Sequence, residues 1–201
     1  MELPNYQIEE SLLKEGVQIV AGMDEVGRGA GFGPLVVAVV VLSNNAFEGK
    51  VNDSKLLSKV KREKLAKEIK NEARGIGIGV VSAKEINKIG LSKGLTLAGE
   101  RALKKLDLKV DVLLLDGKHN FLSGYGIAVE MVTKGDRKSI SIASASIVAK
   151  VERDSMVLKM SRKYPGYNLE SNMGYATPEH KVKVKELGAT LEHRSNWGWD
   201  N

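Results

Sequence analysis

The chain contains no cysteine and only four prolines among its 201 residues. Without cysteine it forms neither disulfides nor thiolate metal sites, and a reducing cytoplasm is its expected setting. Because prolines are few and there is no repeat or low-complexity tract, no segment resembles a linker between domains. We therefore expect one domain over residues 1–201, with a helical C-terminal part from about residue 165.

The chain also lacks long hydrophobic runs. The longest uncharged apolar stretch, Leu35–Leu42, is far shorter than the roughly 18 residues that a membrane-spanning helix needs. The N-terminal residues lack the basic and apolar segments of a secretory signal. With 42% hydrophobic and 28% charged residues, the composition is that of a folded domain rather than a disordered chain.

Positive charge is in excess. There are 31 Lys and Arg residues against 25 Asp and Glu residues, which gives a net charge of +6 and a pI near 9.3. Such a balance suits a polyanionic partner such as nucleic acid. Many basic proteins bind no nucleic acid, so the charge alone does not identify the partner.

Hydrophobic patterning predicts an α/β fold. Three early strands joined by short loops favour an antiparallel meander, and the later alternation of helix and strand adds parallel strands with helices on both faces. Alternating glycines in Gly75–Val81 predict a bare strand face that packs closely against another element. The predicted strands cover 17–24, 35–42, 75–81, 110–115 and 127–133, and the helices begin at the caps Ser58, Ser92 and Ser139 and end near 73, 106 and 163.

Acidic side chains follow three of the predicted strands. They are Asp24 with Glu25, Asp116, and Asp136. Sites in open α/β sheets lie outside the carboxyl ends of the strands, so these carboxylates converge if the strands are parallel neighbours. The alternative is three unrelated solvated turns, since Asp-Gly is a common turn pair.

Clustered carboxylates would require cations. Two unit charges about 4 Å apart repel by about 4 kcal/mol at an effective dielectric of 20, so four such groups would not stay ionised alone. Oxygen ligands without cysteine suit Mg²⁺ or Mn²⁺. Two such ions about 3.5–4 Å apart form the site that many phosphodiester hydrolases use.

One geometric difficulty concerns the adjacent acids Asp24 and Glu25. Neighbouring strand residues point to opposite faces, so both reach one site only if the chain bends there. Gly27, Gly29 and Gly31 make a bend plausible, and a Gly-rich turn also lets backbone N–H groups approach a phosphate. The glycine spacing matches neither the dinucleotide fingerprint nor the P-loop.

Short motifs follow one another along nearly the whole chain, and together they resemble one family. These motifs are Asp24-Glu25-Val26-Gly27-Arg28-Gly29, Asn52-Asp53-Ser54-Lys55, Leu115-Asp116-Gly117, Lys134-Gly135-Asp136, Ser141–Lys150, Arg153-Asp154, Gly174-Tyr175 with Thr177 and His180, and Thr190 with His193-Arg194. In this order they resemble ribonuclease HII, the type 2 ribonuclease H family. The chain departs from the usual pattern at Ala30, Leu56 and Met173.

The resemblance implies a ribonuclease H-like fold with a five-stranded mixed sheet. It implies an endoribonuclease that hydrolyses RNA in RNA–DNA hybrids and incises 5′ to ribonucleotides embedded in duplex DNA, leaving 5′-phosphate and 3′-OH ends. The implied catalytic and metal-binding residues are Asp24, Glu25, Asp116 and Asp136, with Mg²⁺ or Mn²⁺. The enzyme is expected to be a monomer with no membrane partner.

Substrate contacts follow from the same resemblance. It implies that Gly27, Arg28, Gly29 and Tyr175 read the 2′-OH, the group that distinguishes RNA from DNA. Ser54 belongs to a motif of the family and is a candidate substrate contact. Lys55, Lys134 and Lys150 are candidate phosphate contacts, although exposed lysines are usually only solvated.

Other polar residues favour structural roles. Ser144 and Ser146 are expected to pack rather than to touch substrate. Asp154 lies within the apolar stripe of the long helix and should have an internal partner. His180 and His193 lack the companions of a zinc site, and His180 is expected close to Tyr175.

Two other functions remain open at this stage. One is a DNA nuclease on the same fold, which would cut duplexes without ribonucleotides. The other is a non-catalytic basic RNA-binding domain, whose binding would weaken steeply with salt. Such a module has no reason to end three strands in carboxylates.

Overall fold

A computed structural model describes residues 3–43, 47, 50–51, 54, 57–195 and 197–199. Its five strands form one sheet in the order β3-β2-β1-β4-β5. β1 is antiparallel to β2, which is antiparallel to β3, whereas β4 and β5 run parallel to β1. The predicted mixed sheet is confirmed. The strands are β1 (Val20–Val26), β2 (Leu35–Val41), β3 (Gly75–Val81), β4 (Val112–Asp116) and β5 (Ala128–Val132).

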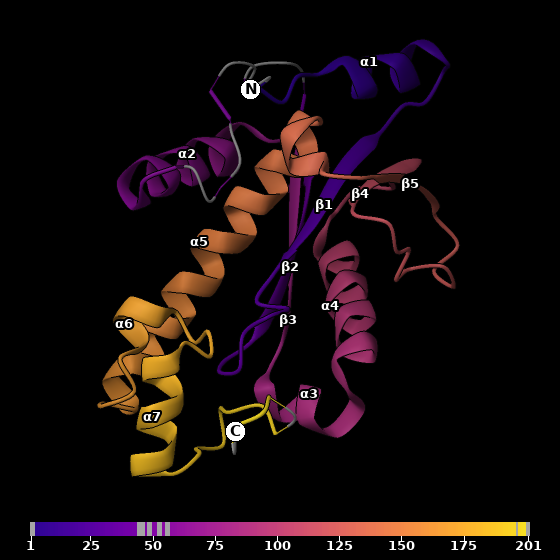
Figure 1. The fold of residues 1–201 in the computed structure, drawn as a ribbon. Coiled ribbons are helices and arrows are strands. Elements are labelled where there is room, and N and C mark those ends of the chain that lie inside the picture. The colour runs from indigo at the N-terminus through magenta and orange to yellow at the C-terminus, as the bar shows by residue number, and fades with distance from the viewer. Residues whose placement is uncertain are drawn as a thin grey trace.

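Helices cover both faces of this sheet (Figure 1). α5 packs on β1 and β2, and α2 packs against α5. α4 packs on β2 and β3 from the opposite face. Figure 1 shows α6 and α7 beside the C-terminal end of α5. The helices are α1 (Gln7–Lys14), α2 (Lys59–Glu72), α3 (Ala83–Ile89), α4 (Leu91–Lys105), the 3₁₀ turn η1 (Gly135–Arg137), α5 (Ile140–Lys163), α6 (Leu169–Asn172) and α7 (Pro178–Leu187).

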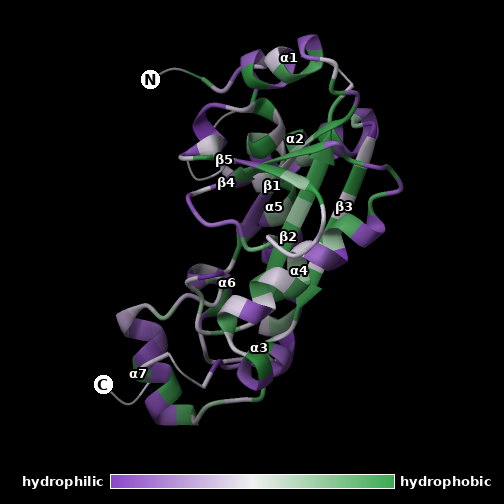
Figure 2. Ribbon diagram, turned by 90° about the vertical axis from the view of Figure 1, so that its right-hand side faces the viewer, coloured by the Kyte–Doolittle hydropathy of each residue, from purple (hydrophilic) through white to green (hydrophobic). Residues whose placement is uncertain are grey.

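The core lies on both sides of β2, which is buried along its whole length. Val36, Ala38 and Val40 pack towards α5, and the alternate residues Val37 and Val39 pack towards α4. Figure 2 shows hydrophobic residues concentrated in the strands and hydrophilic ones on the outer helices. A strand buried on both faces explains the nearly continuous valine run.

The bare face of β3 accommodates the backbone of α4, as the alternating glycines predicted. A Cβ atom on Gly77 would lie 2.0 Å from the Ala102 carbonyl oxygen, and one on Gly79 would lie 1.8 Å from the Ala98 oxygen. Either distance is far shorter than two non-bonded heavy atoms allow. The glycines therefore set the close approach of the helix to the sheet.

The structure corrects two predicted boundaries near the site. β1 begins at Val20 and continues to Val26, beyond its predicted end at Asp24. α4 begins at Leu91 after Gly90 rather than at a Ser92 cap, because α3 precedes it and ends at the same glycine. α3 was not predicted, although Ser82 and Glu85 form a capping box at its start. Among the described helices, none has the length and apolar character to cross a membrane.

Candidate active site

The register of two parallel strands places Asp24 beside Asp116. Met23 of β1 pairs with Leu115 of β4, so the next residues, Asp24 and Asp116, lie on the same face of the sheet. The Gly135 backbone N–H donates to Asp116 Oδ1 at 2.6 Å, which brings η1 against the end of β4. Asp136 in η1 therefore joins the other two acids in one cleft of about 470 Å³.

Glu25 reaches the same cleft from the opposite face, without a bend in the strand. Asp24 and Glu25 pair regularly with Ala38 and Val37 of β2, so the predicted bend at this pair is absent. β4 ends at Asp116, and the chain turns away at Gly117, whose φ is +101°. Because no strand continues beside Glu25 on that side, its side chain can border the cleft at the end of the sheet.

The acids perturb one another. Burial, then the nearby Glu25 and Asp116 carboxylates, raise the pKa of Asp24 well above its usual value, against the lowering effect of a hydrogen bond with Ser146. Burial and Asp116 also raise the pKa of Glu25, although Arg28 opposes this shift. The Arg28 Nη1 atom lies 3.6 Å from Glu25 Oε1. Without a cation, the cluster favours bound protons over full ionisation.

The donor set fits a divalent cation. All four predicted acids line one cleft, and their oxygen atoms are the ligands that Mg²⁺ and Mn²⁺ prefer. Within the described part of the chain, no three or more acid or histidine side chains lie close enough together to hold a metal ion as they stand. Bound cations would therefore need these carboxylates to move closer together, with water or phosphate oxygens as further ligands.

The Gly27–Gly29 turn lines the cleft beside Tyr175. Ala30 forms an antiparallel bridge with Tyr175, so the turn and the segment before α7 are held together. Gly27 has a φ of +94°, and a Cβ atom there would lie 2.2 Å from Arg153 Nε. Gly29 differs, because nothing lies within 4 Å of the corresponding position.

Two buried arginines hold this turn in place, and sequence reasoning missed their role. Arg153 on α5 donates to the carbonyl oxygens of Pro34, Phe32 and Met173 at 2.9 to 3.0 Å. Arg194 donates to the carbonyl oxygens of Gly33 and Gly27, the latter at 2.7 Å. The available signal was an arginine at position 153, between apolar positions of the long helix.

Besides the acids and the turn, Ser54, Ser146 and Lys150 line the cleft. The Ser54 and Ser146 hydroxyl oxygens lie 3.1 Å apart, and Lys150 Nζ lies 2.7 Å from Asp154 Oδ1. The predicted internal partner of Asp154 is thus a lysine. Ser144 is fully buried, as expected for packing, whereas the buried Ser146 also borders the cleft.

Two predicted lysine contacts are not placed in the cleft. Lys55 lies outside the described residues, as do Asn52, Asp53 and Leu56. Lys134 is exposed at a φ of +56°, and it is not among the residues that line the cleft. The structure therefore gives Lys150, but not Lys134, a position beside the acids.

His180 and His193 form a buried chain that ends at Tyr175. The Thr190 backbone N–H donates to His193 Nδ1 at 2.9 Å, so a neutral His193 carries its proton on Nε2. That atom lies 3.3 Å from His180 Nε2, and His180 Nδ1 lies 2.9 Å from the Tyr175 carbonyl oxygen. Burial, followed by His180, lowers the pKa of His193 to about 4. The expected proximity of His180 to Tyr175 is confirmed.

A second cleft of about 580 Å³ adjoins the first and was not predicted. It shares Glu25, Arg28 and Asp116 with the acid cluster and extends towards the start of α4. Lys118 and His119 lie on its rim. Glu25 and Asp116 therefore lie between the two clefts, as suits a substrate longer than either one.

The comparisons with known proteins agree with this geometry. A family model described as ribonuclease HII matches residues 21–198. The ribonuclease HII of Caldanaerobacter subterraneus subsp. tengcongensis is 42% identical over 94% of this chain and 78% of its own length. That of Ruegeria pomeroyi is 41% identical over 98% of this chain and 83% of its own.

Solved structures extend the agreement to the fold. The ribonuclease HII of Archaeoglobus fulgidus, determined in a complex with PCNA, is 29% identical with a TM-score of 0.78. The ribonuclease H2 of Pyrococcus horikoshii is 29% identical with a TM-score of 0.75. Each match covers 90% of this chain and 95% of the other. The chain therefore belongs to the ribonuclease HII family, the metal-dependent endoribonucleases that hydrolyse RNA in RNA–DNA hybrids.

Proposed function

We propose that the acid-lined cleft cuts the phosphodiester bond 5′ to a ribonucleotide, in RNA–DNA hybrids and in duplex DNA with embedded ribonucleotides. Asp24, Glu25, Asp116 and Asp136 would hold Mg²⁺ or Mn²⁺. The observation that carries this proposal is the meeting of four carboxylates in one cleft, two of them with a raised pKa. We also propose that the enzyme acts as a monomer in the cytoplasm.

The bound cations would activate water and stabilise the charge of the leaving oxygen. Backbone N–H groups orient the carboxylates before any cation binds. The Glu25 backbone N–H donates to Asp24 Oδ1 at 2.7 Å, and Gly135 fixes Asp116 in the same way. Carboxylates held by the backbone lose little freedom when an ion binds, which strengthens the site.

Selection of a ribonucleotide is assigned to the turn and to Tyr175. The Arg153 guanidinium lies over the Tyr175 ring at 5.3 Å, and the bridge to Ala30 sets the distance between ring and turn. The open space at Gly29 leaves its backbone accessible from the cleft. A ribose whose 2′-OH bonds to this backbone would fit between them, and deoxyribose would leave that bond unmade.

The decisive experiment is an incision assay on duplex DNA that carries one ribonucleotide. With Mg²⁺ or Mn²⁺, we expect a single cut 5′ to the ribonucleotide, and with a chelator no cut. The matched duplex without a ribonucleotide serves as control. Intact substrate in the presence of metal would refute the proposal, and equal cutting of the all-DNA duplex would instead identify a DNA nuclease.

A further inference from the structure

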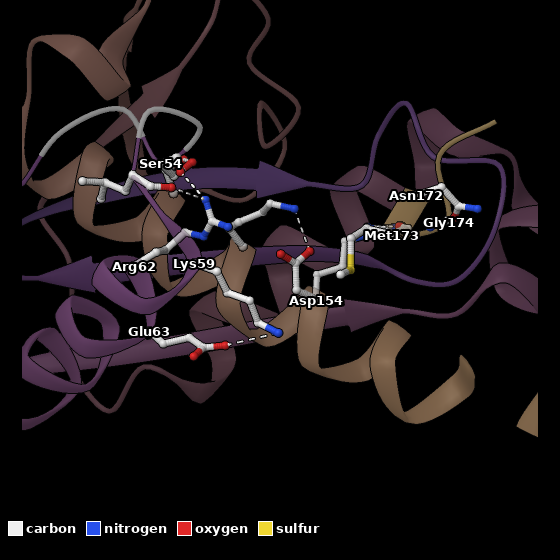
Figure 3. Close-up of polar contacts among 12 residues, drawn as sticks. Ser54, Lys59, Arg62, Glu63, Asp154, Asn172, Met173 and Gly174 are labelled. Carbon is white, nitrogen blue, oxygen red and sulfur yellow. Dashed lines mark hydrogen bonds and ion pairs between the residues drawn. The ribbon is translucent and has the colours of Figure 1, made fainter. Parts of the chain in front are cut away.

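A basic groove of about 400 Å³ lies between α2 and α5, next to the catalytic cleft. It contains four cationic side chains, Lys59 and Arg62 of α2 and Lys159 and Arg162 of α5. Figure 3 shows Lys59, Arg62 and Glu63 on α2 near Asp154 on α5. Glu63 and Asp154 are the acidic side chains of the groove, so positive charge is in excess.

The two acids of the groove already have partners. Glu63 Oε1 lies 4.0 Å from Lys59 Nζ, and Asp154 is paired with Lys150 of the catalytic cleft. Lys159 and Arg162 are exposed, and no side-chain hydrogen bond or ion pair within the described residues engages either. These two cations are therefore available to an anionic partner.

The groove is joined to the catalytic cleft at two points. Arg62 Nη1 donates to the carbonyl oxygen of Ser54 at 2.5 Å, and Ser54 lines the cleft (Figure 3). The Lys150–Asp154 ion pair connects cleft and groove along α5. A helix rises 1.5 Å per residue, so the twelve residues from Lys150 to Arg162 span about 18 Å. At ~3.4 Å per nucleotide along a strand, this is roughly five nucleotides.

We propose that the α2–α5 groove binds the phosphate backbone of the substrate duplex about five nucleotides from the bond that is cut. The proposal rests on the proposed function, because it takes the duplex to lie in the acid-lined cleft. Lys159 and Arg162 make the contacts, and Arg62 binds Ser54, which lines the cleft. Phosphate contacts carry no sequence or sugar information, so the groove strengthens binding without selecting ribonucleotides.

The test is a binding experiment on the whole protein in a chelator, where no cleavage occurs. The Lys159→Ala/Arg162→Ala variant is compared with the wild type and with Lys104→Ala/Lys105→Ala. This control removes the same charge from exposed positions at the end of α4. Each protein is titrated over a range of salt with duplexes of about 24 and about 8 base pairs. Both lengths are prepared with and without one ribonucleotide, and thermal unfolding checks that every variant is folded.

For the long duplex we expect the groove variant to lose about tenfold in affinity, and the slope of log K against log salt to fall by about 2. The loss should be the same with and without the ribonucleotide, and clearly smaller for the short duplex. An equal loss in the control variant, or an equal loss on both lengths, would overturn the proposal. If instead an acidic protein segment occupies the groove, the variant will bind every duplex like the wild type.

The two proposals fail separately. Incision of the short duplex by the wild type tests the catalytic cleft and does not require the groove. A wild type that cuts nothing would defeat the proposed function, whereas the difference between long and short duplexes would still report on the groove.

Discussion

The molecule buries a cationic and an anionic side chain in neighbouring places, and the groups around the two differ. Arg153 is fully buried, and three carbonyl oxygens accept its N–H groups. Asp24 is almost as buried, with 7% of its surface exposed, yet the Glu25 and Asp116 carboxylates nearby raise its pKa. Burial of a charge is tolerated when it is compensated. The arginine is compensated by carbonyl oxygens, whereas the acid has hydrogen bonds from Glu25 and Ser146 but also lies beside other carboxylates, which a bound cation would compensate.

This contrast separates charged residues that stabilise the fold from charged residues that serve the cleft. The arginines stabilise the turn around the cleft, so their loss should appear in the free energy of unfolding. The acids store repulsion, so their loss should appear in catalysis, with stability retained. Four changes can sharpen or break this distinction.

The largest effect is expected from Asp116→Asn and Asp136→Asn. Each removes a carboxylate proposed to bind the metal, and the rate of single-turnover cleavage should fall by roughly 10³-fold or more, since bound metal would supply several kcal/mol of transition-state stabilisation. Substrate binding and unfolding free energy should be retained, because one repulsive charge is gone. Asp107→Asn, at an exposed loop position, is the control. Full cleavage by either site variant would contradict the assignment of the acids.

A second comparison uses Arg153→Met and Arg28→Met. Arg153→Met should lower the unfolding free energy by about 3–5 kcal/mol, because buried carbonyl groups lose their donors. Arg28 is 56% exposed beside Glu25, so its replacement should change stability by less than about 1 kcal/mol and reduce cleavage instead. Chemical denaturation and incision rates measure the two effects. Similar stability in the two variants would break the comparison.

The glycines of the turn provide a matched pair. Gly27→Ala combines a positive φ with overlap on Arg153, and we expect a loss of about 2 kcal/mol or more. Gly29→Ala meets open space at an ordinary φ, so stability should stay within about 1 kcal/mol. Its methyl group would instead occupy the cleft and weaken binding of ribonucleotide-containing duplex. Equal destabilisation by both changes would show that the open space is filled in solution.

The smallest effect concerns pH. Since the folded pKa of Asp24 lies above its ordinary value of 3.8, its contribution to stability is present below that value and is lost as pH rises through the folded pKa. The metal-free wild type should therefore lose stability relative to Asp24→Asn as pH increases. Added Mg²⁺ should reduce this difference at neutral pH, because it binds the folded state. Parallel stability curves for the two proteins would show that the pKa of Asp24 is not raised in the folded state.

Much of this arrangement could be predicted from local patterns in the sequence. The valine run of β2, the glycines of β3 and the acid after Leu115 each follow from one segment, because burial and strand periodicity act locally. The position of Glu25 could not be predicted in that way, since it depends on where β4 ends. The carbonyl groups that compensate Arg153 come from residues as far away as Phe32 and Met173, which only the folded chain brings together.

The register between β1 and β4 restricts how the length of this chain can change during evolution. Side chains alternate along a strand, so the loss of one residue between Val20 and Met23 would turn Asp24 away from Asp116. Core residues can be exchanged for others of similar volume. Insertions should instead be tolerated in the exposed turn of residues 123–126, between β4 and β5. We therefore expect the register to fix the length of β1, even where the composition of the core can change.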